Sequence, residues 1–121
     1  MAKLYTRQEA DKLLPYLAPT LIELRDKFEE AAQIRVEITR AAAGNGGSKK
    51  REKWSRLLAR VDELIDRLNE WEIVLRNVGT GLVDFPAVVD GRPAFLCWKL
   101  GEPRVAYYHS PDDGFQGRRL L

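Results

Sequence analysis

The stretch GLVDFPAVVDGRPAFLCWKL, residues 81–100, decides the fold because the pattern of the sequence changes there. It is rich in β-branched and aromatic residues, which are typical of strands. Asp90 and Gly91 divide it into two segments, and Asp-Gly favours the type I′ turn of a tight β-hairpin. A third segment of this kind, RVAYYHS, follows at residues 104–110. Residues 80–121 are therefore predicted to form a small three-stranded antiparallel β-meander with an irregular tail.

The residues before this block follow a helical pattern instead. Apolar residues recur at alternating spacings of four and three, which places them on one face of a helix. The first series is Leu17, Leu21, Leu24, Phe28, Ala31, Ile38 and Ala42, with Arg35 as a charged member. The second series is Leu57, Val61, Leu64, Leu68, Trp71, Leu75 and Val78. Because the glycine-rich link GNGGS (44–48) separates them, we expect two long helices in an antiparallel hairpin, the second ending before Gly79.

A short separate helix is expected at the start of the chain. Thr6 and Glu9 have the spacing of a capping box, so a helix should begin near Arg7. Pro15 lacks an N–H group and its ring clashes with the preceding helical turn, so this first helix is predicted to break near Leu14. The long hairpin would then begin after the break.

The predicted fold class is α+β: a short helix, a long antiparallel helical hairpin and a small three-stranded antiparallel β-meander. We expect a single domain over residues 1–121, with a helical part at 1–79 and the meander and tail at 80–121. Two helices of about 30 residues, on the order of 45 Å each, are too long for this meander to cover. We therefore expect a homodimer with a coiled-coil-like four-helix arrangement. The expected partner interface consists of Leu57, Leu64, Leu68, Trp71 and Phe28.

The composition is that of a soluble globular protein, with 45% hydrophobic and 31% charged residues and a net charge of +2. No apolar run approaches the roughly 20 residues needed to span a bilayer, so no membrane partner is expected. The start MAKLYTRQEA lacks the apolar segment of a secretory signal, which predicts a cytoplasmic protein. The single cysteine cannot form a disulfide within the chain, so we expect a reduced thiol.

Cys97 and His109, the only cysteine and the only histidine, are the first candidates for chemistry. They could act as a nucleophile with its base or as two metal ligands. A thiolate nucleophile needs a general base within hydrogen-bond reach, and a metal ion needs three or four convergent donors. If Gly101 and Glu102 form a two-residue turn, Cys97 faces Ala106, and the alternation of side chains puts Cys97 and His109 on opposite faces of the sheet. A longer loop would shift this register. The interpretation from the two-residue turn is that Cys97 is a small packed hydrophobe.

A metal or ligand site around His109 is the second candidate. The spacing His-x-x-Asp between His109 and Asp112 offers an imidazole and a carboxylate to a divalent metal ion, or a base oriented by an acid. Glu102, Asp84 and Arg118 are the supporting candidates. The structural alternative is that this segment, SPDDG, is simply a good turn sequence.

Nucleic-acid binding is the third candidate, through the basic start of the second long helix. The basic residues there are Lys49, Lys50, Arg51, Lys53, Arg56 and Arg60. Such a cluster can neutralise phosphates. Acidic residues are interleaved with it or follow closely, however, and mixed charge of this kind is typical of a solvated helix face. We therefore do not expect nucleic acid as the main partner.

Three motifs of the C-terminal block resemble the signature of a conserved bacterial and archaeal family of unknown function. They are GLVDFP (81–86), LCWKLGE (96–102) and GFQGR (114–118), and His109 lies between the last two. The resemblance covers nearly the whole chain and implies a helical N-terminal half joined to this block, without an established activity. The family pattern has Trp before the histidine and an acidic residue after it. Here Tyr108 and Ser110 occupy those positions, which makes a metal site less favoured.

The leading functional interpretation is a noncatalytic binding or assembly module that dimerises through the hairpin and presents the C-terminal block as a ligand surface. The alternative is a metal-binding protein or metal-dependent enzyme with a site around His109, Asp112 and Glu102, whose cofactor is a divalent metal ion. The lack of a second His or Cys favours the module. The sequence leaves open whether the protein is an enzyme and which small molecule it binds.

Overall fold

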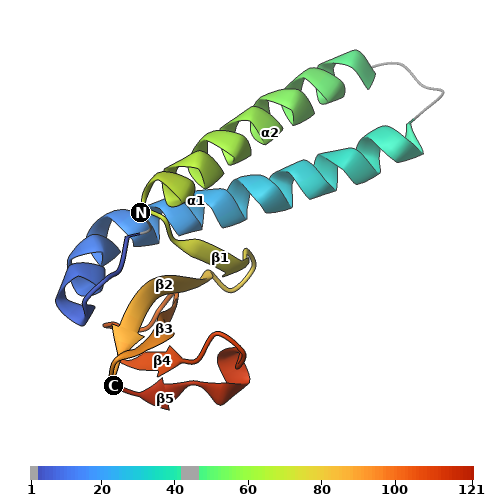
Figure 1. Cartoon of the computed structure of the whole chain (residues 1–121). Coiled ribbons are helices and arrows are strands. Elements are labelled where there is room, and N and C mark those ends of the chain that lie inside the picture. Colours follow the sequence, from blue (N-terminus) through green and yellow to red (C-terminus); the bar gives the residue numbers. More distant parts are fainter. Residues whose placement is uncertain (1–2, 42–46) are drawn as a thin grey trace.

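The fold is an antiparallel helix pair followed by an antiparallel sheet, which confirms the predicted α+β class (Figure 1). A computed structural model describes residues 3–41 and 47–121. The helices are α1 (Arg7–Arg40), α2 (Gly47–Glu70) and a short 3-10 helix, Phe115–Gly117. The strands are β1 (Val74–Asn77), β2 (Leu82–Val89), β3 (Arg92–Lys99), β4 (Tyr107–His109) and β5 (Arg119–Leu120). Within these residues, no helix is long and apolar enough to cross a membrane.

Helix α1 begins with the predicted capping box. The Thr6 hydroxyl accepts a hydrogen bond from the backbone N–H of Glu9 (3.1 Å), and the Glu9 carboxylate accepts one from the backbone N–H of Thr6 (3.0 Å). Two N–H groups that have no partner in the first helical turn are satisfied in this way. The prediction that a helix begins near Arg7 is confirmed.

The predicted break at Pro15 is wrong, because α1 continues through Pro15 and Pro19 as one helix of 34 residues. A proline inside a helix costs about 3 kcal/mol. The leucines that follow, Leu17, Leu21 and Leu24, are fully buried, and burial of each contributes about 1.5–3 kcal/mol. Tertiary packing on both sides of the prolines therefore outweighs their local cost.

The second helix ends earlier than predicted, at Glu70 rather than before Gly79. Glu72 has a positive φ of 57°, which ends the helical path, and the buried side chain of Ile73 follows it. Leu75 then lies in strand β1, where it is paired with Val83 of β2. The helical spacing of Leu75 in the sequence therefore does not reflect a helix at that position.

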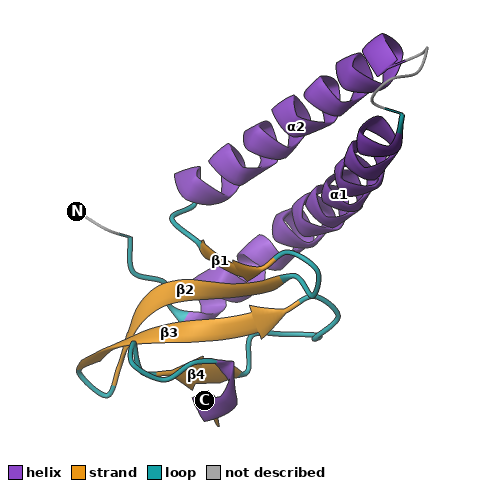
Figure 2. Ribbon diagram, turned by 90° about the vertical axis from the view of Figure 1, so that its right-hand side faces the viewer, coloured by secondary structure: helices purple, strands orange, loops and turns teal. Residues whose placement is uncertain are grey.

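The sheet has five strands in the order β1-β2-β3-β4-β5, all neighbours antiparallel, rather than the three predicted (Figure 2). The β2–β3 hairpin closes as expected, with positive φ values of 53° at Asp90 and 75° at Gly91. The added strands come from the predicted end of the second helix and from the tail. Both pair because they lie beside an edge of the meander whose backbone groups need hydrogen-bond partners.

One face of the sheet packs against the helices and forms the main core. The core side chains from the sheet include Val83, Phe85 and Trp98, and they meet leucines of α1 and α2. The outer part of the helix pair extends beyond the sheet, as Figures 1 and 2 show. We call this part, residues 25–40 of α1 and 47–60 of α2, the arm. The link predicted at residues 44–48, and Ala42 before it, lie partly or wholly outside the described residues.

The expected partner interface needs correction. Leu57, Leu64 and Leu68 are buried within the single chain, because the two helices pack their apolar stripes against each other and against the sheet. These three side chains are therefore not available for contact with a second chain. Trp71 is half-buried against the main core, whereas Phe28 on the arm is 49% exposed.

Candidate metal centre

The pairing of β3 with β4 places Cys97 and His109 on the same face of the sheet. Phe95 is opposite His109, and Cys97 is opposite Tyr107. The prediction that the two residues point to opposite faces is therefore wrong. The reason is the connection between the strands, which is longer than two residues and is held by a hydrogen bond from the Val105 N–H to the Asp11 carboxylate (2.7 Å). A one-residue change in register moves every side chain to the other face.

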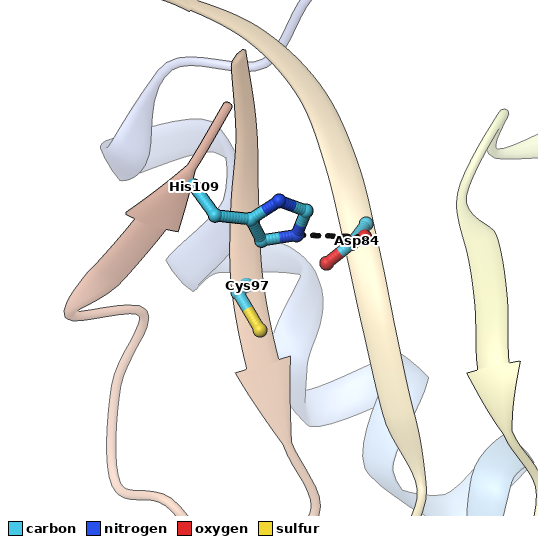
Figure 3. Close-up of side chains that lie close together, drawn as sticks. All are labelled: Asp84, Cys97 and His109. Carbon is cyan, nitrogen blue, oxygen red and sulfur yellow. Dashed lines mark hydrogen bonds and ion pairs between the residues drawn. The ribbon is translucent and has the colours of Figure 1, made fainter. Parts of the chain in front are cut away.

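Three neighbouring strands each contribute one polar side chain to this face. Asp84 of β2 is directly opposite Cys97 of β3, and His109 of β4 lies beside them. Their exposed fractions are 1%, 1% and 4%. One potential ligand atom from each lies within 4.8 Å of the others, and Figure 3 shows the three side chains close together. The helices cover the opposite face, so this cluster lies apart from the main core.

Both ring nitrogens of His109 face oxygen atoms. Nδ1 is 2.7 Å from the carbonyl oxygen of Ser110, which can only accept, so Nδ1 carries a proton and donates it. Nε2 is 2.9 Å from Oδ2 of Asp84. A neutral ring would therefore direct the lone pair of Nε2 at a carboxylate. A positive charge between these two atoms, a proton or a metal ion, resolves this contact.

Asp84 has one satisfied oxygen and one unsatisfied oxygen. Oδ2 also accepts a hydrogen bond from Nε of Arg76 on β1 (2.8 Å), and this guanidinium lies over the ring of Phe95. Oδ1 is buried and has no hydrogen-bond partner among the described residues. A buried carboxylate oxygen without a partner is costly and is rare in native proteins.

Arg118 approaches the sulfur of Cys97 from the tail. Its Nη1 is 3.8 Å from Sγ. Its guanidinium carbon Cζ lies 3.9 Å from the ring centre of Tyr107 and 4.4 Å from that of Phe115. Burial raises the pKa of the Cys97 thiol, although the hydrogen bond from Arg118 acts in the opposite direction. Cys97 is therefore a thiol rather than a thiolate at neutral pH.

Glu102 holds Arg118 in place through both carboxylate oxygens, one of them 3.2 Å from Nη1. Burial acts to raise the pKa of Glu102. The hydrogen bonds from Arg118 and from the backbone N–H of Lys99 outweigh it, so the pKa lies below its usual value. Glu102 is thus a positioning residue for Arg118.

The cluster opens into a cavity of about 300 Å³ that is lined among others by Arg76. The tail segment 111–115, which includes Asp112 and Phe115, forms one wall of this cavity. Asp113 anchors this segment by accepting a hydrogen bond from the Ser110 hydroxyl (3.0 Å). Gly117 lets the segment close, since a Cβ atom there would lie only 2.7 Å from Cβ of Asp113. The turn expected at SPDDG is therefore also the wall of a polar cavity.

The predicted site residues are brought together in two groups. His109 and Asp84 are in contact, and Asp112 lines the same cavity. Glu102 and Arg118 pair with each other and reach the cluster through Cys97. Sequence reasoning considered Cys97 together with His109 but favoured packing for Cys97, and it missed Arg76. The turn at Asp90-Gly91 could have predicted that Cys97 lies beside Asp84. In a hairpin with a two-residue turn at 90 and 91, positions 84 and 97 are opposite each other.

The chain is thus an α+β protein in which a helical hairpin is joined to a five-stranded antiparallel sheet, with a buried Asp-Cys-His cluster on the outer sheet face. The chain belongs to the family described as Uncharacterized conserved protein (DUF2203), which it matches over residues 3–121. Comparisons with curated proteins and with solved structures give no match.

Proposed function

We propose that this protein binds a divalent transition-metal ion through Asp84, Cys97 and His109. The observation that carries the proposal is Oδ1 of Asp84, a buried carboxylate oxygen that lacks a partner among the described residues and belongs to a cluster of potential ligands. A cation bound there would satisfy it. Arg76 would keep its hydrogen bond to Oδ2 and orient the carboxylate from outside.

The hydrogen bonds of His109 also favour a bound metal ion. Its Nδ1–H donates to the Ser110 carbonyl, an arrangement that fixes the ring and leaves Nε2 for a metal. Neither nitrogen faces Sγ of Cys97 within hydrogen-bond distance, so a Cys-His nucleophile pair is less favoured than a metal site. Ligand atoms around a tetrahedral zinc ion are about 3.5 Å apart, so binding requires side-chain shifts of about 1 Å.

The donor set selects the class of metal. A thiolate with an imidazole and a carboxylate suits Zn²⁺ or Fe²⁺ and does not suit Mg²⁺ or Ca²⁺, which prefer oxygen ligands. Three protein ligands leave a fourth position for water or a small molecule, as in catalytic zinc sites. The cavity of about 300 Å³ gives that position access to solvent.

Metal titration of protein stripped with a chelator tests the proposal. We expect one Zn²⁺ or Co²⁺ per chain, and a thiolate-to-cobalt charge-transfer absorption that disappears in Cys97→Ser. Asp84→Asn and His109→Gln should each weaken binding by more than the roughly 10–100-fold that loss of an outer partner costs. Asp90→Asn is the matched control, because it removes an exposed carboxylate from the same hairpin and should bind like the wild type.

Circular dichroism and thermal unfolding in chelator identify any variant that fails to fold. Folded wild-type protein that takes up none of zinc, cobalt, iron or manganese in calorimetry contradicts the proposal. So does uptake that is equal in wild type and in Cys97→Ser.

A second proposed function is assembly through the arm. The observation that favours it is an open apolar groove of about 520 Å³ along the arm, lined mainly by Phe28, Ala31, Ala32, Val36, Trp54 and Leu58. Phe28 and Val36 are exposed although they are large and apolar. Sedimentation equilibrium at micromolar concentration tests this function, with Phe28→Glu expected to weaken association. Val88→Glu is the control, because Val88 is equally exposed but lies on the sheet.

A further inference from the structure

Charge is segregated along the helix pair. The outer end, residues 35–40 and 47–56, carries seven Lys or Arg residues and two Glu, and we call it the tip. The inner part, residues 20–30 and 60–70, carries eight Asp or Glu and four Lys or Arg, and we call it the base. The net charge of the whole chain is only +2, so this separation is a local property of the hairpin.

The apolar groove runs along the arm from the base into the tip. Phe28, a residue of the base, marks its inner end, and Trp54 belongs to the tip. Arg35 and Arg40 also line the groove, which explains why a charged residue interrupts the apolar series of α1. A partner that fills the groove must therefore present an apolar centre, with negative charge toward the tip and positive charge toward the base.

We infer that the occupant of the groove is a second copy of this chain, packed antiparallel along the arm. The inference rests on the proposed assembly function and names its partner and orientation. In this arrangement the basic tip of each chain lies beside the acidic base of the other, and the two grooves close on each other around a two-fold axis. The same surface then serves both chains, as a two-fold interface requires.

A parallel arrangement does not fit the same charges. It would bring two basic tips together and two acidic bases together, and like charges at an interface are repulsive. The apolar residues of the groove would supply most of the affinity, while the charges would fix orientation and speed association. Because the charges are exposed, this orientation effect should weaken at 1 M salt, where the screening length is about 3 Å.

A charge-reversal experiment tests the orientation. One variant combines Lys49→Glu, Lys50→Glu and Arg51→Glu, which reverses the tip. The other combines Asp62→Lys, Asp66→Lys and Glu70→Lys, which reverses the base. All six side chains are exposed, so both variants should fold with unchanged circular dichroism. Each variant alone places like charges together and should sediment as a monomer, whereas an equimolar mixture should restore the dimer.

Carbodiimide cross-linking of mixed light and heavy isotope-labelled chains distinguishes the two orientations directly. Cross-links between chains should join the tip lysines of one chain to base carboxylates of the other. Cross-links confined to tip with tip regions overturn the antiparallel arrangement.

The remaining outcomes separate the two proposals. A wild type that is a monomer at every concentration removes both the assembly function and this inference. A wild-type dimer that persists in both reversed variants keeps assembly and overturns the antiparallel arm. A monomer that forms a complex only when duplex RNA is added, and loses it in the tip variant, assigns the basic tip to nucleic acid and also overturns the inference.

Discussion

The sheet and the arm depart from ordinary burial in opposite ways. The outer face of the sheet buries an ionisable cluster, Asp84, Cys97 and His109, whereas the arm exposes large apolar side chains such as Phe28. Buried polar groups and exposed apolar patches are the informative exceptions to the rule that apolar residues lie inside. The comparison shows two separate features, a buried polar cluster and an exposed apolar groove, that the burial of apolar side chains alone does not explain.

Replacing one phenylalanine in each region gives the largest expected contrast. Phe85→Ala should lower the free energy of unfolding by about 3–5 kcal/mol, because Phe85 is fully buried between sheet and helices. Phe28→Ala should change it by less than about 0.5 kcal/mol in the monomer. Urea unfolding at low protein concentration measures both values. Comparable losses would show that the arm groove is part of the core.

Removing a carboxylate charge from each region should give the next largest effect. Asp84→Asn removes a buried charge that contacts the buried His109 and the partly exposed Arg76, and we expect a loss of about 3 kcal/mol in chelator. Glu23→Gln removes the partner of Arg60 on the helix surface, where solvent screens the charges, and should cost much less. Thermal unfolding of the two variants measures the difference. Equal losses would show that the contacts of Asp84 contribute no more to stability than an exposed ion pair.

A glycine in the cavity wall provides a smaller test of the sheet region. Gly117→Ala should cost about 1–3 kcal/mol, because the added methyl group would overlap Asp113 and displace the tail. Gly114→Ala is the matched control, since a Cβ atom there meets nothing within 4 Å. Metal affinity should fall in the first variant and stay unchanged in the second. The opposite ranking would show that the tail does not shape the cavity.

The smallest expected effect is a pH dependence from Glu102. Its pKa is lowered in the folded protein from the usual 4.5, so the stabilisation is complete above that value and is lost as pH falls below it. Glu102→Gln should reduce stability at pH 7 by about 1 kcal/mol and flatten the acid side of the stability curve. Urea unfolding between pH 3 and 7 measures this slope. An unchanged slope would mean that the ion pair with Arg118 does not contribute.

The local signals of the sequence were sufficient for much of the fold. The Thr6 capping box and the Asp90-Gly91 turn depend on short-range hydrogen bonds and backbone conformation, and both are confirmed. The structure at Pro15 and at Leu75 was predicted wrongly because long-range packing determines it. Leu75 pairs with the edge of the sheet as part of β1. Burial of residues on both sides of Pro15 stabilises α1 as one continuous helix.

The candidate site was only half predictable for a similar reason. The pairing of Asp84 with Cys97 follows from the two-residue turn between their strands, which the sequence contains. The position of His109 depends on the longer connection after Lys99, and that connection is held by Asp11 from the distant start of α1. No pattern near His109 carries this information. The exposure of Phe28 likewise depends on where the sheet ends along the helices.

The unbroken helix α1 gives the arm a defined length. Its 34 residues form one continuous helix through Pro15 and Pro19, a path of about 51 Å at about 1.5 Å per residue that runs from the sheet to the end of the arm. In an antiparallel pair, two sheets would therefore stand at opposite ends of a common rod. Two metal sites would be held at a fixed separation, and the assembly could bind two ligands, or two points of one long ligand, at a distance set by the helix.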